Sequence, residues 1–300
     1  MKKKTYLFTL MAMALTLGSC SDNENGIGGE TSKYITVSTS IGNMTRVATD
    51  EKGGQTFEEG DEISVYAWTG APTVAPETSE RVVNNAINKL TNGSWISNPQ
   101  MLWKNNRDKH YFIGVYPISA ISDLSAGEYT FDETKQVESD LLVAVNKDGL
   151  SYNVDEPQTV PLTFTHVMAK LAVNLTYKNQ WGGIPTVEKV VVGNAAKEAT
   201  INYLTKVVTP STTAKEDFSL PEITENTKYV SVIIPQEEVT QLTIVIGGKN
   251  FVYDNGTPFK LESGKITTVN LEVGRDEIKL GDVKITNWED GSTFSGEALN

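Results

Sequence analysis

The sequence predicts an all-β protein built from sandwiches of antiparallel sheets. Apolar residues recur at every second position in most segments, as they do in strands with one buried face. Ten or more such segments follow one another at short spacing, separated by turn-forming residues. The chain has 24 glycines and 11 prolines, and its apolar share of 39% is too high for a disordered chain.

Composition narrows the function classes. The 300 residues carry a net charge of −12, which repels phosphate backbones and anionic lipid head groups. The charge therefore argues against nucleic-acid binding and against polybasic membrane docking. One cysteine cannot form an internal disulfide, and two histidines leave little material for a metal site. The length accommodates two domains of ordinary size. The sequence therefore predicts no cofactor, no metal and no nucleic-acid partner.

The N-terminus has the pattern of a signal peptide at residues 1–19. Three lysines at positions 2–4 precede an apolar run from Tyr6 to Leu17, which at about 12 residues is shorter than the roughly 20 needed to span a bilayer. The run ends in Leu17-Gly18-Ser19-Cys20, which resembles the lipobox of bacterial lipoproteins. We therefore predict that Cys20 becomes the acylated first residue, carrying palmitate and tethering the chain to a membrane.

Residues 20–33 are predicted to be a polar linker after the lipidated Cys20. The run Ser21-Asp22-Asn23-Glu24-Asn25 resembles the acidic signals that send lipoproteins of Bacteroidales to the cell exterior, although a solvated linker would look similar. Removing residues 1–19 changes the net charge from −12 to −15, because three lysines and no acids are lost. The acidity therefore belongs to the folded part.

Strands are predicted in order along the rest of the chain. The first is Ile35 to Ile41, in which Ile35, Val37, Thr39 and Ile41 share one face. The longest alternating stretch runs from Val167 to Leu175. The remaining predicted strands are Ile63 to Trp68, Tyr111 to Tyr116, Leu141 to Val145, Val160 to Phe164, Val187 to Val192, Tyr229 to Ile234, Leu242 to Ile246, Phe251 to Tyr253 and Ile266 to Val273.

One segment fits a helix as well as a strand. Glu80 to Leu90 places its apolar residues at helical spacing, but three asparagines in it weaken a helix. A domain boundary is predicted near Pro157 to Thr165, where an acidic, proline-containing stretch interrupts the strands. This gives an N-terminal β-sandwich domain at 34–160 and a C-terminal one at 161–300.

No pattern in the sequence indicates an active site. His110 and His166 have no second ligand at zinc spacing, so each is interpreted as a structural histidine. A triad assembled in space remains open, but no Gly-x-Ser-x-Gly elbow occurs. The acidic runs are interpreted as solvated loops, and the five tryptophans as packing residues in preference to a sugar-binding platform. The prediction is a protein that is not an enzyme.

A series of short motifs resembles the fimbrillin family of Bacteroidales, the subunits of type V pili. Each motif is weak alone, but together they cover most of the chain in order. They are Met44-Thr45-Arg46-Val47, Phe57-x-x-Gly60-Asp61-x-Ile63-x-Val65-Tyr66, Asn92-Gly93-Ser94-Trp95, His110 to Pro117, Ser139 to Ala144, Phe164 to Leu171, Ile233-Ile234-Pro235-Gln236, Gly264-Lys265 and Ile285-Thr286-Asn287-Trp288.

The resemblance implies two tandem transthyretin-like β-sandwich domains and a function in assembly. In this family a trypsin-like protease at the outer surface cuts after an arginine near the first strand, here between Arg46 and Val47. Loss of the strand would expose an unpaired edge and an apolar groove. A donor strand from another subunit would fill the groove, and repetition without closure would give a filament.

The family pattern makes residues 281–300 the candidate donor strand. Val283 and Ile285 keep the two-residue period, and Trp288 is a large anchor. Glu289-Asp290-Gly291-Ser292 then breaks the alternation. A folded-back C-terminus would suit a terminal subunit, whereas an extended one would suit a stalk subunit.

Two functions therefore compete. The first is a pilus subunit or accessory component on the outer membrane surface and then in the fimbrium, partnered by other subunits and by a host or bacterial receptor in adhesion. The second is a monomeric outer-surface lipoprotein that binds a glycan or host ligand without polymerising. The first needs a cleavable strand and a donor, and the second needs neither.

Overall fold

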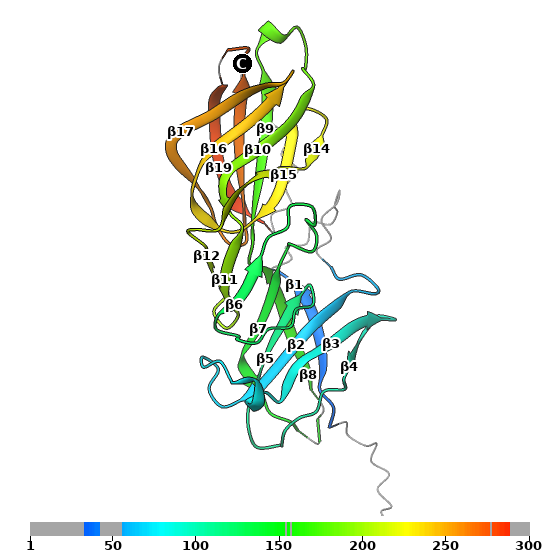
Figure 1. The fold of residues 1–300 in the computed structure, drawn as a ribbon. Coiled ribbons are helices and arrows are strands. Elements are labelled where there is room, and N and C mark those ends of the chain that lie inside the picture. Colours follow the sequence, from blue (N-terminus) through cyan, green and yellow to red (C-terminus); the bar gives the residue numbers. More distant parts are fainter. Residues whose placement is uncertain (1–32, 43–55, 154, 157, 277, 289–300) are drawn as a thin grey trace, which may run out of the picture. The chain divides into compact units, whose positions relative to one another are not determined.

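The computed structural model describes residues 33–42, 56–153, 155–156, 158–276 and 278–288, and these fold into β-strands arranged in four sheets (Figure 1). This confirms the predicted all-β fold. Two short 3-10 helices, η1 (Thr78–Glu80) and η2 (Asn179–Trp181), lie in connections between strands. Among the described residues there is no helix with the length and apolar character to cross a membrane.

The first half of the chain forms a seven-stranded sheet. Its first edge strand, β1, runs parallel to β8, with Thr36 opposite Thr159 and Ile41 opposite Phe164. The order across the sheet is β1 (Thr36–Ile41), β8 (Thr159–His166), β7 (Leu142–Leu150), β5 (His110–Tyr116), β2 (Glu62–Thr69), β3 (Val83–Thr91) and β4 (Ser94–Asn98).

The two edges of this sheet approach each other. Trp95 of β4 donates its indole N–H to Thr39 Oγ1 of β1 at 3.0 Å. Just before β1, Ile35 N donates to Met101 O at 2.9 Å, and Trp103 N donates to Lys33 O at 3.2 Å. The sheet therefore curls around its own interior, and β1 has neighbours on both sides.

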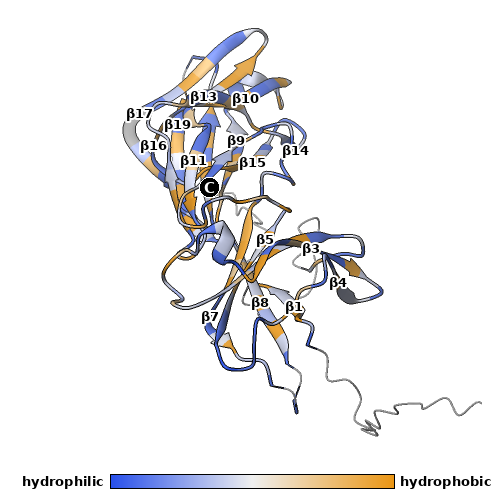
Figure 2. Ribbon diagram, turned by 60° about the horizontal axis from the view of Figure 1, so that its bottom comes forward, coloured by the Kyte–Doolittle hydropathy of each residue, from blue (hydrophilic) through white to orange (hydrophobic). Residues whose placement is uncertain are grey.

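Alternate residues of the seven-stranded sheet enter two separate cores. Phe112, Val65 and Phe164 are fully buried inside the curled sheet, together with β1. Their sequence neighbours Tyr66 and Ile113 point to the other face and join a larger core that continues into the second half. Along the strands of both halves hydrophobic stretches accordingly alternate with hydrophilic ones, and β5 is among the most hydrophobic strands in view (Figure 2).

The second half contains two sheets whose buried residues form one core. The five-stranded sheet has the order β14 (Glu222–Thr224), β15 (Lys228–Ile233), β9 (Ala169–Tyr177), β18 (Lys265–Val273) and β19 (Ile278–Asn287). The four-stranded sheet has the order β13 (Lys215–Ser219), β10 (Val187–Ala196), β16 (Gln236–Ile246) and β17 (Lys249–Leu261). Val173 and Val269 from the first sheet pack with Val190 and Ile244 from the second, as in a β-sandwich.

A small three-stranded sheet joins the two halves. It has the order β12 (Val207–Pro210), β11 (Glu198–Asn202) and β6 (Gly127–Thr130). β6 precedes β7 in the chain, whereas β11 and β12 follow β10. The pairing of Gly127 with Ile201 and of Thr130 with Glu198 therefore links segments on either side of the β8–β9 connection.

The helix considered for Glu80 to Leu90 is wrong, because Val83 to Thr91 forms β3 between β2 and β4. Asn85 has a positive φ of 57°, and the register with β2 shifts between Val65 and Ala67. This bulge interrupts the two-residue period and brings both Val83 and Ala86 to buried positions. Because the bulge places these two buried residues three positions apart, the segment has the apolar spacing of a helix.

The predicted domain boundary between residues 160 and 161 falls inside a strand of the seven-stranded sheet, β8. β8 extends to His166 and belongs with β7 and β1, while β9 begins the second half at Ala169. Two pairings are parallel, β1 with β8 and β9 with β18. The tandem transthyretin-like arrangement of two independently folding domains stays a prediction.

Gly114 of β5 tests how tightly the curled sheet is packed. A Cβ there would lie 2.6 Å from Phe164 Cζ and 3.1 Å from Leu162 Cδ1. We expect Gly114→Ala to lower the free energy of unfolding by about 1–3 kcal/mol, measured by urea denaturation. The matched control is Gly193→Ala, where the nearest atom, at 2.7 Å, is the flexible end of Gln241. Equal losses in the two variants would contradict the packing argument.

Candidate functional site

Three of the predicted site residues, Cys20, Arg46 and Val47, lie outside the described residues, and three lie within them. Arg46 follows the last residue of β1, Ile41, by five positions in the sequence. Val283 and Ile285 belong to β19, and Trp288 comes immediately after it. The candidate site therefore consists of two strands in different sheets, β1 and β19.

β1 supplies part of the core of the curled sheet. Ile35, Val37 and Ile41 are 2%, 6% and 8% exposed, and all three belong to the inner core cluster. On the opposite face the strand is polar: the hydroxyl of Ser40 donates to Thr163 Oγ1 at 3.2 Å, and those of Thr36 and Thr159 lie 3.1 Å apart. The predicted alternation of the first strand is confirmed.

An aromatic cluster covers the core where β1 ends. Phe57 packs edge-to-face on Trp95, Tyr116 and Phe164, with ring centroids 5.3, 5.4 and 5.1 Å away. Gly42 N, directly after β1, donates to Phe164 O at 2.7 Å. Sequence reasoning listed Phe57 only as part of a motif. Its contacts, which no local pattern reveals, place it over the end of the β1 slot, the position beside β8 and near β4 that β1 fills.

β19 is the outer strand of the five-stranded sheet. It pairs antiparallel with β18, with Val283 opposite Val269 and Ile285 opposite Thr267. Directly opposed residues point to the same face, and Val269 and Thr267 are fully buried. Val283 and Ile285 therefore face the interior side of the sheet, yet they are 38% and 37% exposed.

Trp288 is buried at the end of β19, with 7% of its surface exposed. Its ring is parallel to that of His166, with a centroid distance of 4.2 Å and an interplanar angle of 6°. Lys170 Nζ lies 4.3 Å from the centre of the Trp288 ring, and burial lowers the pKa of this lysine. Trp288 N donates to Gly264 O at 3.0 Å.

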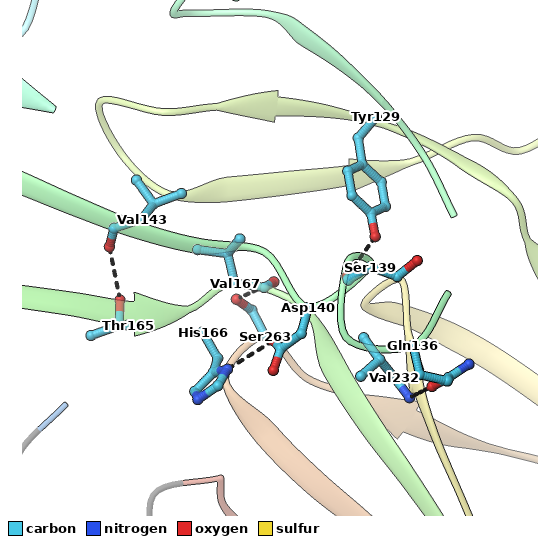
Figure 3. Close-up of polar contacts among 10 residues, drawn as sticks. All are labelled: Tyr129, Gln136, Ser139, Asp140, Val143, Thr165, His166, Val167, Val232 and Ser263. Carbon is cyan, nitrogen blue, oxygen red and sulfur yellow. Dashed lines mark hydrogen bonds and ion pairs between the residues drawn. The ribbon is translucent and has the colours of Figure 1, made fainter. Parts of the chain in front are cut away.

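The surroundings of Trp288 are held by further polar contacts, several of which Figure 3 shows. His166 Nδ1 lies 2.8 Å from Asp140 Oδ1, and Ser263 Oγ donates to Val167 O at 2.9 Å. Nearby, the side-chain oxygen of Gln136 accepts from Val232 N at 2.7 Å. Loop residues between β6 and β7 therefore fix both His166 and the edge of β15.

The two histidines have structural roles, as predicted. His110 is fully buried. Its Nε2 accepts from Lys104 N at 3.0 Å, and its Nδ1 lies 3.1 Å from Asp108 O, so the neutral ring fixes the loop between them. Burial lowers the pKa of His110. His166 forms the stack with Trp288.

The acidic loops and the tryptophans also contribute to structure. Glu59 accepts from the backbone N–H groups of Asn92 and Gly93 at 2.9 and 2.6 Å, and Asp61 accepts from Glu58 N at 2.7 Å. Within the described ranges no group of three or more histidine, cysteine or acidic residues is arranged to hold a metal ion. The five tryptophans are divided between the two cores.

Comparisons with known proteins agree with this fold. The profile of a family described as fimbrillin-like matches residues 45–288. Among curated proteins no relative matches. The chain is similar to the crystal structures of two proposed cell adhesion proteins, from Bacteroides ovatus and Bacteroides uniformis, each at 17% identity, with TM-scores of 0.65 and 0.61. The matches cover 85% and 86% of this chain and 98% and 100% of the others.

A third similar structure is that of a fimbrial protein from Bacteroides vulgatus. It has 12% identity and a TM-score of 0.51, with 84% of this chain and 99% of the other covered. At these identities the similarity establishes the fold alone.

The buried His110 gives the stability a pH dependence. Its pKa is below the ordinary value of 6.5, so the unfolded chain takes up the proton at a higher pH than the folded chain. The contribution of His110 is complete above about pH 6.5 and is lost as the pH falls below that value. We expect His110→Gln to be less stable than the wild type at about pH 7.5, and the difference to shrink towards about pH 5 in denaturant titrations. A difference that does not change with pH would contradict this assignment.

Proposed function

We propose that this chain, which belongs to the fimbrillin-like family, is a non-enzymatic subunit or accessory component of a cell-surface pilus, with a role in adhesion. The observation that carries the proposal is the placement of β1. This strand completes the inner core of the first half, and the only arginine before residue 81 follows it within a few positions. One cut after Arg46 would separate the strand from the rest of the chain.

Removal of β1 would leave an incomplete sheet. Burial of an aliphatic side chain contributes about 1.5–3 kcal/mol, and β1 with its preceding residue supplies Ile35, Val37 and Ile41. A domain has a total stability of only about 5–15 kcal/mol, so the loss would be large. The backbone groups of β8 that face β1 would also lose their partners. A donor strand with apolar residues at every second position would restore both.

The donor in this proposal is the C-terminal segment of another subunit. Val283 and Ile285 have the required spacing, and both are more than a third exposed in the free chain. Among the described strands β19 pairs with β18 alone, so fewer contacts hold it than hold a central strand. The partners are thus further copies or related subunits, a trypsin-like maturation protease and a surface receptor.

Export as a lipoprotein precedes assembly in this scheme. The sequence around Cys20 would place the precursor at the outer membrane through its lipid, and cutting after Arg46 would release it from that anchor into the fimbrium. Both steps are inferred from sequence motifs that lie before the described residues or between them.

The second candidate, a tethered monomeric binder, is favoured by the state of the C-terminus. β19 is already paired with β18, and Trp288 is already buried in its own chain. Such a protein would keep the Cys20 anchor and bind a glycan or host ligand without polymerising. The two candidates differ in the behaviour of the chain after proteolysis.

Treatment of the purified precursor with a trypsin-like protease tests assembly. We expect a product beginning at Val47 by mass spectrometry and a ladder of oligomers by size-exclusion chromatography. Arg46→Gln should abolish both, whereas Arg107→Gln, which changes an exposed arginine elsewhere in the chain, should leave both unchanged. Deletion of residues 282–300 should permit cleavage but abolish the ladder. A cleaved product that stays monomeric would sink donor exchange and favour the tethered binder.

The lipid anchor is tested by substitution of Cys20. We expect Cys20→Ser to lose palmitate labelling and to leave the membrane fraction, because the thiol is the acylated group. Ser21→Ala serves as the control and should keep both properties. Membrane retention of the Cys20→Ser precursor would show that another feature holds the chain at the surface.

A further inference from the structure

The strand β19 has little packing of its own. None of its ten residues, Ile278–Asn287, is buried. Val283 and Ile285, although they face the interior side of the sheet, remain more than a third exposed. Ile278 and Leu280 pack against the core but are only partly buried, so the strand itself contributes little beyond these two side chains and its pairing with β18.

The next residue differs sharply from the strand. Trp288 is 7% exposed, and its large ring can contribute more apolar burial than any residue of β19. The imidazole of His166 stacks on the ring, and the ammonium group of Lys170 also lies over it. A cation over the face of an indole contributes more where both groups are shielded from water, and Lys170 is largely shielded.

The Trp288 socket, formed by His166, Lys170 and Gly264, is fixed by contacts that do not involve Trp288. His166 is held by Asp140, and Gly264 N donates to Met168 O at 2.8 Å. Lys170 belongs to β9, a strand with neighbours on both sides. His166 and Gly264 are therefore held independently of Trp288, so little ordering of these two residues is needed for binding.

We infer that Trp288 is a latch that holds the C-terminal strand β19 in its own sheet, and that β19 becomes available to another subunit only after Trp288 leaves the socket. The second part rests on the proposed function. The first part concerns the free chain alone. In this arrangement Trp288, which the sequence marks as an anchor for donation, restrains the donor within its own chain.

Hydrogen exchange of the full chain, read by mass spectrometry on peptides from 278–287, tests the latch. We expect Trp288→Ala to speed exchange in β19 on the order of 30-fold, because the burial and stacking of the ring are lost. Trp103→Ala, which removes a tryptophan from the other core, should leave β19 unchanged. An increase of less than about twofold in Trp288→Ala, or an equal increase in Trp103→Ala, would overturn the latch.

A second variant keeps the test readable if Trp288→Ala unfolds more widely. Lys170→Met retains most of the apolar stem and removes the cation over the indole. We expect it to speed exchange in β19 several-fold while β16 and β10 stay protected. Unchanged exchange in β19 in this variant, combined with global unfolding of Trp288→Ala, would also overturn the latch.

Assembly of the protease-cut product separates the latch from the proposed function. With both correct, cut Trp288→Ala should form oligomers on the order of tenfold faster than the cut wild type, because the restraint on β19 is gone. Faster exchange in β19 without oligomers in any cut variant would support the latch and refute donor exchange. Oligomers at the wild-type rate, with exchange also unchanged, would refute the latch and leave donor exchange standing.

Discussion

The pairing of β1 with β8 is the interaction on which the first half depends. An open sheet edge beside an apolar core leaves backbone N–H and C=O groups unpaired and apolar side chains exposed to water. β1 pairs with the first and covers the second. Its inner residues complete the core around Phe164, and its backbone takes up the free edge of β8. Because the contacts of β1 with β8 and with the segment around Met101 are non-covalent, one strand can in principle be replaced by another of similar pattern.

In the second half the two edges of the five-stranded sheet are covered in different ways. Beside β15, the short strand β14 and the side chain of Gln136 occupy backbone donors. At the other side β19 leaves apolar side chains exposed, and Trp288 at the end of the strand is stacked on His166. The molecule therefore protects one edge with residues from elsewhere in the chain, and in the proposed latch the other edge is a strand that is released only when Trp288 leaves its socket.

Much of the fold is predictable from the sequence, because alternation of apolar residues directly reports which face of a strand is buried. It gives β1, β8, β9 and β18 without further information, while β5 is predicted from a nearly continuous β-branched and aromatic run and is buried on both faces. It fails at β3, where the bulge at Asn85 shifts the period. It also cannot give the parallel pairing of β1 with β8, or the stack of Trp288 on His166, because both bring together residues more than a hundred positions apart. Motifs identify Cys20, Arg46 and Trp288 as residues of interest, but a motif does not say which partner a side chain meets.

The direct connection between β8 and β9 has a mechanical consequence. Only Val167 and Met168, both buried, separate the strand beside the β1 slot from the strand beside β18. In a filament, tension arriving through a strand in the β1 slot would pass along β8, across these two residues, into β9 and then through β18 to β19. Strands pulled along their length share the load among many hydrogen bonds at once, whereas strands pulled from one end break them in turn. The path would therefore favour a subunit that resists stretching through its sheets, with the surrounding loops carrying little of the force.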